Sequence, residues 1–530
     1  MAGAPRAQME ADARFAEGVL YETQGDIPRA VAAFRSALEA APGDEELARE
    51  VARRFLRYQQ PGAALAILQP FSTNSTHYEL PLLQAEGHLL QNRPTEALTA
   101  LREAHKRGAP LAALVPLLLP VLQRPDALPA EARPLAFVRE LLDAPHADAE
   151  SLLVLADAYA RLTTLDPAER SQSAEVLART ARRVESLNPA TPEQQFGLAE
   201  LHLRSGAVEQ AIRWYEQARA AVPEASPLRR LVLARLADLY LQTGRAEPAR
   251  EVLEDLSKAD PMNVQVHFVL ANLALEAGRP AEAVDAYRRA LTLNPKLEAA
   301  YYNLAQALLA LQQPQQALAT MESARTNIGR TFLVEYLSGL AASQMRDYAT
   351  ARKHFLAAEV LASTSETNRL NAALYFQLGV TAERTGDIPA AVRAFEQCLK
   401  LDPKFHPAQN YLGYMWAERG ENLDRAHQLI EQAVQADPHN SAYLDSMAWV
   451  LFQLGRPAEA LPWMEQALAT MDEPDPTMYD HYGDILAALG RTNEARQAWQ
   501  RALELDPNNE TIRRKLQPDP SAAGSAHPAP

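Results

Sequence analysis

The sequence predicts an all-α protein, a right-handed superhelical solenoid of about 13 helix pairs. Apolar residues make up 47% and charged residues 22% of the 530 positions, which suits a folded chain rich in good helix formers. Several positions recur at a spacing of 34 residues. Most of the 37 prolines fall where this repeat places helix boundaries, where proline is tolerated. Together these observations favour a stack of short helices over a single large core.

The repeat is clearest in the middle of the chain, where small and large residues keep their character from one unit to the next. Small residues recur at two positions: Ala237, Ala271, Ala305 and Gly339, then Ala249, Ala283, Ala317 and Ala351. Large residues recur at a third position and mostly alanine at a fourth: Leu253, Tyr287, Met321 and Phe355, then Leu256, Ala290, Ala324 and Ala358. A fixed period of this length is typical of a helix pair that buries its apolar face by stacking on its neighbours.

Each unit is expected to contain two helices, A and B, with positions counted from the first residue of the unit. Small residues at position 8 of helix A and at positions 20 and 27 of helix B permit close packing, and a large residue at position 24 fills the space between units. Proline near position 17 starts helix B, because its missing N–H costs nothing there. Glycine at position 15 is expected to end helix A in the left-handed conformation at Gly244, Gly278, Gly386, Gly455 and Gly490.

This pattern resembles the tetratricopeptide repeat family, whose consensus is W-x2-L-G-x2-Y, then A-x3-F, then P. The first unit matches it at Gly18, Tyr21, Gly25, Ala30, Phe34, Ala37 and Pro42, and the last at Gly483, Gly490, Ala495, Trp499, Ala502 and Pro507. The resemblance implies helix pairs at residues 11–44, 45–77, 78–110, 150–190, 192–225, 230–261, 264–295, 298–329, 332–365, 372–403, 406–438, 441–473 and 476–507.

The repeat register divides the chain into five expected blocks. They are N-terminal repeat units at 1–110, a proline-rich irregular helical segment at 111–149, central units at 150–365, C-terminal units with a capping helix at 366–516, and a disordered tail at 517–530. The capping helix is expected at Asn509–Leu516. Extra residues between Tyr159 and Ala174 predict a long turn or extended helices, and the polar stretch Ala362–Arg369 is an insertion between two units.

The segment at 110–149 is the main irregularity. It holds seven prolines and fits no repeat, so it is expected to be a distorted helical pair or a spacer. Its apolar stretch, Leu111–Leu122, is shorter than the roughly 20 residues that cross a bilayer. Pro116 and Pro120 are expected to break this stretch, because proline removes a helical hydrogen bond.

Charge and motifs exclude several classes of function. The net charge of −15 disfavours nucleic acid and anionic membrane surfaces as ligands. No phosphate loop, dinucleotide fingerprint, zinc helix or nucleophile elbow is present, so no catalytic residue, cofactor or metal is expected. Asp480, His481 and Asp484 are interpreted as a solvated acidic helix face rather than a metal site, and Cys398 at position 27 as a buried small residue. Without a recognisable secretory signal the chain is expected in the cytoplasm, or in the periplasm or at the outer membrane if a lipoprotein signal has been removed.

The family resemblance implies that helix A lines a concave groove, with positions 2, 5, 9 and 12 facing it. Position 5 carries Phe268, Tyr302, Tyr336, Phe376, Asn410, Asp445 and Asp480; position 9 carries Asn272, Gln306, Leu340, Val380, Tyr414, Trp449 and Asp484; position 12 adds Phe452. An aromatic row on such a face favours an interface, although the rings could instead pack inside the solenoid. The absence of lysine at positions 5 and 9 argues against binding of an acidic chain terminus. With 17 acidic and 9 basic residues at 405–516, a partner with basic side chains is expected at that end.

The run NYLGYMWAERGENLDRAHQLIEQAVQADPHNSAYLDSMAWVLFQLGRPAEAL is similar to bacterial envelope tetratricopeptide lipoproteins. Shared features are the L-G-Y motif, one inserted residue before Ala426, and L-D-S followed by Trp449. The resemblance implies a non-catalytic scaffold or adaptor for partner proteins or extended segments, with a processing protease as one candidate partner. Two alternatives stay open: a regulatory or spacer arm of a larger enzyme assembly, and a structural spacer with an empty groove.

Overall fold

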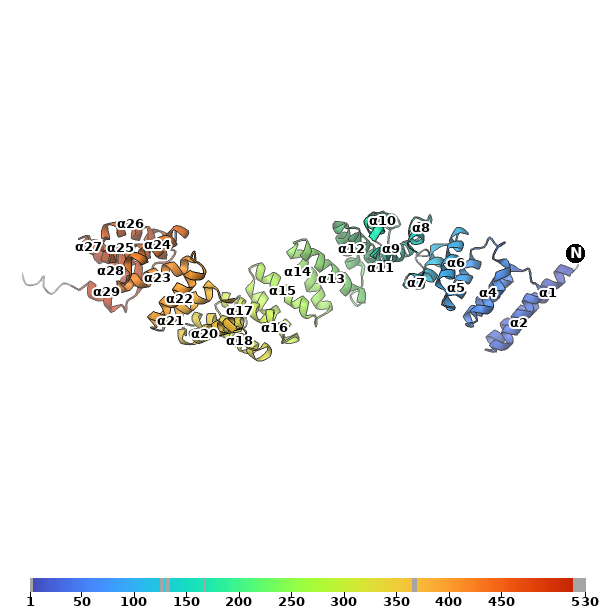
Figure 1. Cartoon of the computed structure of the whole chain (residues 1–530), viewed down its shortest axis with the longest axis horizontal. Coiled ribbons are helices and arrows are strands. Elements are labelled where there is room, and N and C mark those ends of the chain that lie inside the picture. The colour runs from blue at the N-terminus through green and yellow to red at the C-terminus, as the bar shows by residue number, and fades with distance from the viewer. Residues whose placement is uncertain (1–2, 124–127, 129–133, 165–166, 365–368, 518–530) are drawn as a thin grey trace, which may run out of the picture. The chain divides into compact units, whose positions relative to one another are not determined.

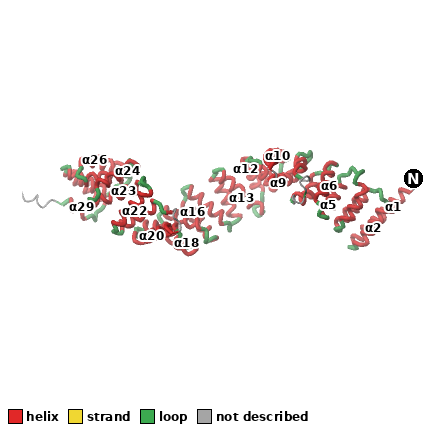
Figure 2. The backbone as a smooth tube through the Cα atoms, viewed as in Figure 1, coloured by secondary structure: helices red, strands yellow, loops and turns green. Residues whose placement is uncertain are grey.

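The computed structural model of the chain consists of helices joined by short loops (Figures 1 and 2). It describes residues 3–123, 128, 134–164, 167–364 and 369–517, and these contain no β-strand. The all-α repeat solenoid predicted from the sequence is therefore confirmed. The contacts divide the chain into two compact units, Met1–Pro261 and Met262–Pro530, each of which is described by itself. This division falls between two repeats of the predicted central block.

The N-terminal unit contains six helix pairs and two further helices. The pairs are α1 (Gly3–Thr23) with α2 (Ile27–Ala40), α3 (Glu45–Arg57) with α4 (Pro61–Leu68), α5 (Glu79–Leu90) with α6 (Pro94–Lys106), α9 (Ala149–Thr164) with α10 (Pro167–Ser186), α11 (Pro192–Arg204) with α12 (Val208–Ala221), and α13 (Pro227–Gln242) with α14 (Ala246–Ala259). The further helices are α7 (Leu111–Leu122) and α8 (Leu135–Leu142), and a 3-10 turn, Gln69–Phe71, follows α4.

The C-terminal unit contains seven helix pairs and a terminal helix. The pairs are α15 (Val264–Glu276) with α16 (Pro280–Leu293), α17 (Glu298–Ala310) with α18 (Pro314–Ile328), α19 (Phe332–Gln344) with α20 (Tyr348–Thr364), α21 (Ala372–Arg384) with α22 (Ile388–Leu401), α23 (His406–Arg419) with α24 (Leu423–Ala436), α25 (Ser441–Gln453) with α26 (Pro457–Thr470), and α27 (Pro476–Ala488) with α28 (Thr492–Leu505). The terminal helix is α29 (Glu510–Lys515). Every one of the 13 predicted units thus holds a helix pair.

Glycine at position 8 explains how helix A approaches helix B so closely. A Cβ atom built on Gly339 would overlap the ring of Phe355, the large residue at position 24 of the same unit. The same holds for Gly379 under Phe395. Because the rings occupy the space that a side chain at position 8 would need, the large residue at position 24 requires glycine at position 8 in these units. Phe355 and Phe395 are fully buried as a result.

The backbone at position 15 turns as expected from the sequence. Gly244 and Gly278 have φ angles of 71° and 70°, in the left-handed region that favours glycine. Cys398 at position 27 is fully buried, and burial raises the pKa of its thiol to about 11. This agrees with its interpretation as a small packing residue.

One expectation for the proline-rich segment is wrong, because α7 runs without a break from Leu111 to Leu122 and contains both Pro116 and Pro120. The two prolines and Ala112 are exposed, and they share one face of the helix. The carbonyl groups that lose their N–H partners therefore face solvent, where water can satisfy them. α7 packs against α5, α6 and α9. None of the described helices has the length and apolarity to cross a membrane.

Three further irregularities have a structural outcome. The extra residues after Tyr159 lengthen both helices of their pair, since α9 has 16 residues and α10 has 20. The insertion Ala362–Arg369 lies partly outside the described residues, as does the predicted tail. The predicted capping helix is α29, which packs against α28 and buries Ile512.

Candidate functional site

The aromatic rings predicted at position 5 are only partly exposed for a partner, because they also pack inside the solenoid. In five units the ring at position 5 lies against the ring at position 24, with centroids 5.3 to 5.9 Å apart: Phe15 on Phe34, Phe196 on Tyr215, Phe268 on Tyr287, Tyr336 on Phe355, and Phe376 on Phe395. Packing inside the solenoid was the alternative left open for these rings, but their pairing with position 24 was not predicted. Phe268, Tyr336 and Phe376 are half-buried, so they combine a packing role with partial exposure.

Where the ring at position 24 carries an O–H or N–H group, a polar residue at position 9 of the same unit accepts a hydrogen bond from it. The hydroxyl groups of Tyr215 and Tyr287 donate hydrogen bonds of 2.6 Å to Glu200 and Asn272. The indole N–H of Trp499 donates to Asp484 over 3.1 Å. Asn272 and Asp484 are thus held by their own repeats, in addition to any contact with a partner.

Three other predicted residues lie on two neighbouring A helices of the C-terminal unit, α17 and α19. The Tyr302 hydroxyl is 3.0 Å from the Thr331 hydroxyl, and Gln306 is exposed. Tyr336 stacks on Phe332 with ring centroids 5.5 Å apart. The Tyr302 contact links α17 to the start of α19, whereas the Tyr336 ring stacks within α19 itself. Partner binding at these residues stays a prediction.

Three predicted residues do come together in a cleft of about 740 Å³ on the A helices α21, α23 and α25, closed at one side by the start of α27. We call it the tyrosine cleft. Its lining comprises Glu383, Arg384, Asn410, Tyr411, Tyr414, Met415, Glu418, Arg419, Ala442, Asp445, Ser446, Asp475, Thr477 and Met478. Asn410, Tyr414 and Asp445 are the predicted members, and Tyr411 adds a ring whose hydroxyl donates to Glu383 over 3.1 Å.

A buried charge cluster supports the tyrosine cleft. The ring of His481 contacts the Asp445 carboxylate at 2.9 Å and the Glu418 carboxylate at 3.7 Å. Burial alone would lower the pKa of His481, but the two carboxylates outweigh it and raise the pKa to about 9. His481 is therefore a buried cation at neutral pH, only 4% exposed. Its interpretation as part of a solvated acidic face is wrong, because its partners come from two preceding repeats.

Trp449 and Phe452 lie next to this cluster rather than in the lining of the tyrosine cleft. Trp449 stacks on His481 with centroids 3.9 Å apart, and Phe452 stacks on the other side of Trp449 at 5.1 Å. Trp449 is 8% exposed and belongs to the hydrophobic core. The indole therefore shields the cation from water and has little area left for a partner.

The carboxylates of Asp480 and Asp484 share one intramolecular cation. The ammonium group of Lys515, on the terminal helix α29, lies 2.8 Å from Asp480 and 2.7 Å from Asp484. The predicted role of these residues, binding basic side chains of a partner, would require competition with Lys515. Within the described part of the chain, no three His, Cys, Asp or Glu side chains are placed to hold a metal ion.

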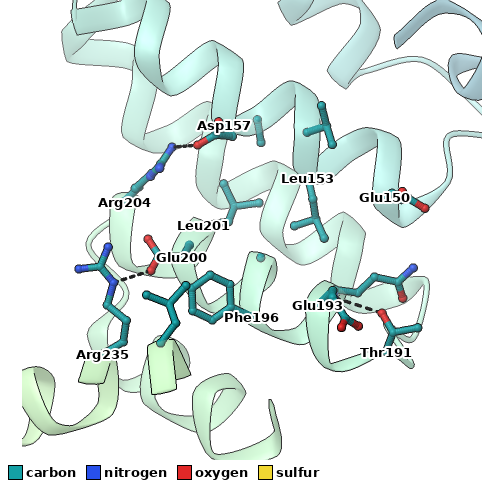
Figure 3. A pocket seen from close by; sticks show the side chains of 15 residues that line it. Glu150, Leu153, Asp157, Thr191, Glu193, Phe196, Glu200, Leu201, Arg204 and Arg235 are labelled. Atoms are coloured by element: carbon teal, nitrogen blue, oxygen red, sulfur yellow. Dashed lines mark hydrogen bonds and ion pairs between the residues drawn. The ribbon is translucent and has the colours of Figure 1, made fainter. Parts of the chain in front are cut away.

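A second cleft, of about 730 Å³, lies in the N-terminal unit on the A helices α9, α11 and α13 (Figure 3). We call it the leucine cleft. Its lining comprises Glu150, Leu153, Val154, Ala156, Asp157, Thr191, Glu193, Gln194, Phe196, Gly197, Glu200, Leu201, Arg204, Leu231 and Arg235. This cleft was not predicted from the sequence, because groove positions were assigned only to the units from residue 264 onward. The signal was present: Phe196 and Glu200 occupy positions 5 and 9 of their unit, and Leu231 occupies position 2 of the next.

Comparisons with known proteins agree with this architecture. A family profile described as tetratricopeptide repeat matches residues 230–508, and a second with the same description matches residues 5–45 and 168–226. A TPR repeat-containing protein of Pseudomonas aeruginosa is 27% identical over 219 residues, which cover 36% of each chain. Protein FlbA of Caulobacter vibrioides is 28% identical over 169 residues, which cover 32% of this chain and 27% of that protein. The chain thus spans about a third of the length of these curated relatives.

Similar solved structures include the APC/C hetero-tetramer Cut9–Hcn1 and the MamA protein. The first is 16% identical with a TM-score of 0.38 and covers 90% of each chain. The second is 20% identical with a TM-score of 0.30 and covers 33% of this chain and 92% of that one.

Proposed function

Because the chain belongs to the tetratricopeptide repeat family, we propose that it is a protein-binding scaffold whose tyrosine cleft holds a segment of a partner protein. The observation that carries the proposal is the convergence in one cleft of Asn410, Tyr414 and Asp445, which the repeat register and the family resemblance predicted as groove residues. Two tyrosines in its wall suit a protein partner, since tyrosine is enriched at interface hot spots.

The charge of the tyrosine cleft favours a partner segment with basic side chains. Four carboxylates line the cleft against two arginines. Two of the carboxylates, Asp445 and Glu418, already face the His481 cation. Glu383 lies 3.4 Å from Arg384, and Asp475 accepts backbone hydrogen bonds at the start of α27. The excess of carboxylates still gives the cleft a net negative charge, which a lysine or arginine of the partner would approach.

A narrower form of the proposal is an adaptor for a processing protease of the bacterial envelope. It rests on the resemblance of the run that begins at Asn410 to envelope lipoproteins of the family. Tyr414, Asp445 and Ser446 from the shared motifs line the tyrosine cleft, and Trp449 shields the cation beside it. The motifs that carry the resemblance are thus the residues that build the cleft.

The proposal is tested by affinity capture with the full chain and with Tyr414→Ala, followed by mass spectrometry. Truncation of a central interface tyrosine costs about 2 kcal/mol or more, a loss of roughly 30-fold in affinity. Partners that use the tyrosine cleft should therefore be lost from the variant. Tyr482→Ala serves as the matched control, because Tyr482 is half-buried on α27 outside the cleft lining. Equal recovery of every partner by the Tyr414→Ala variant would refute the proposal for this cleft.

A further inference from the structure

We infer that the leucine cleft is a second binding site, for an amphipathic peptide segment that inserts a large apolar side chain and carries lysine or arginine at one end. This site lies in the N-terminal unit and shares no residue with the tyrosine cleft. It therefore goes beyond the proposed function and can be tested separately from it.

The floor of the leucine cleft is apolar and partly open to solvent. It is formed by Leu153 and Val154 of α9, Phe196 of α11 and Leu231 of α13. Leu231 is 46% exposed, and the first three are half-buried. Figure 3 shows the Phe196 ring near the centre of the cleft, below the labelled Leu201 and Leu153. Apolar surface gathered from three helices in a concave site offers an insertion point for a large apolar side chain.

One edge of the cleft is electrically neutralised by ion pairs within the chain. Arg204 contacts Asp157 at 2.7 Å, and Arg235 contacts Glu200 at 2.9 Å, as the dashed lines in Figure 3 indicate. Glu200 also accepts the hydrogen bond from Tyr215. Glu200 and Arg204 lie in the last turns of α11, Asp157 and Arg235 lie in the middle of α9 and α13, and each arginine already has a counter-ion.

The opposite edge carries negative charge without a counter-ion. Glu150 and Glu193 lie in the first turns of α9 and α11, and both are exposed. No hydrogen bond or ion pair joins either carboxylate to another residue that the structure describes. Since the arginines are paired at the far edge, the cleft runs from an acidic edge across an apolar floor to a neutral edge. This order selects a segment with a basic residue on one side of its apolar residue.

Acidic residues in a first helical turn also stabilise the helix dipole, which needs no ligand. The two explanations differ in what a charge-neutral substitution changes. Loss of the dipole interaction affects the stability of the helix, and it does so at any first-turn glutamate. Loss of a contact with a basic partner affects affinity and its salt dependence, and only at Glu150 and Glu193.

The experiment is a phage-display selection of random 12-residue peptides on the full chain. Peptides retained by the wild type but not by Leu231→Glu are then synthesised and titrated by fluorescence anisotropy. We expect them to contain a large apolar residue flanked on one side by lysine or arginine. Leu231→Glu should weaken binding by at least about tenfold. Leu241→Glu is the matched control, because Leu241 is another exposed leucine of α13 outside the cleft lining and should leave the affinity unchanged.

The charge is tested with the same peptides. Glu193→Gln should weaken binding by about three- to tenfold at low salt and by less at high salt, since exposed charges are screened. Glu96→Gln removes a comparable first-turn glutamate from α6 and should have no effect on affinity. Tyr414→Ala should also leave the peptide affinity unchanged, which separates this site from the proposed function.

Three results would overturn the inference. The first is a selection that yields no peptide whose binding depends on Leu231. The second is the enrichment of acidic peptides. The third is an equal loss of affinity with Leu241→Glu, because the effect would then reflect the stability of α13 rather than a contact in the cleft.

Discussion

The leucine cleft and the tyrosine cleft occupy the same face of the repeat, yet they differ in where their charges are placed. The leucine cleft keeps its charges at exposed edges, where Arg204 and Asp157 have side chains 37% and 41% exposed. The tyrosine cleft rests on a buried cation, His481, whose ring is covered by Trp449. Similar residue types thus make a solvent-screened rim in one unit and part of the core in the other. This difference shows that burial, rather than residue type, determines how much a charged group contributes to the stability of the fold.

The largest expected difference between the clefts is in stability. Asp445→Ala leaves the buried His481 without its closest carboxylate, and breaking a buried pair in this way costs about 3 to 5 kcal/mol. Asp157→Ala removes an exposed partner of Arg204 and should cost about 0 to 1 kcal/mol. Urea unfolding of the full chain, followed by hydrogen exchange of α25 in one variant and of α9 in the other, measures both. Equal costs would show that His481 is not a buried cation.

The stability around the two clefts should also depend differently on pH, by an amount somewhat smaller than the effect of Asp445→Ala. The pKa of His481 is about 9 in the folded chain, compared with 6.5 for an ordinary histidine. Because the folded pKa is raised, the stabilisation is complete below pH 6.5 and is lost as the pH rises through about 9. It amounts to about 3 kcal/mol.

The measurement is the urea midpoint reported by hydrogen exchange in α27, from pH 6 to pH 10. The wild type should lose stability over this interval relative to His481→Gln, which has no titrating ring at that position. The exchange of α11 under the leucine cleft should show no such difference between the two proteins. Parallel pH profiles in α27 would contradict the prediction.

The smallest expected effect concerns the glycines of the A helices. Gly379→Ala places a methyl group against the Phe395 ring, and such overpacking costs about 1 to 3 kcal/mol. Gly197→Ala, under the leucine cleft, meets only the end of the Leu153 side chain at 3.1 Å. Alanine is favoured over glycine in helices by about 0.8 to 1.0 kcal/mol. This gain should offset the cost of the close contact with Leu153, so the free energy of unfolding should be nearly unchanged. Thermal unfolding compares the two, and a larger loss for Gly197→Ala would reverse the comparison.

The helix pairs could be predicted from the sequence because each depends on residues close to one another along the chain. Small residues at position 8, the turn at position 15 and the large residue at position 24 all lie within one unit. The path of α7 through Pro116 and Pro120 was not predicted. It depends on which face of the helix meets solvent, and that is decided by packing against α5, α6 and α9.

The candidate sites were predicted only in part, for the same physical reason. Register and the family resemblance together assigned Tyr414 and Asp445 to the groove face of helix A, and both line the tyrosine cleft. The partner of Asp445 is His481, which follows it by 36 residues and belongs to the next repeat. Contacts between repeats of this kind determine which charges are buried. A pattern within one unit does not contain that information.

The hydrogen bond between positions 9 and 24 has a consequence for how such a chain can be altered by recombination. Glu200 with Tyr215, and Asp484 with Trp499, are joined within one helix pair, as are Gly339 with Phe355 and Gly379 with Phe395. An exchange of genetic segments at the borders between pairs carries both members of each couple together. A crossover in the turn between helix A and helix B separates them, and leaves a ring without its acceptor or without its space. The repeat is therefore the smallest portion of this chain that can be duplicated, deleted or transplanted with its internal contacts intact.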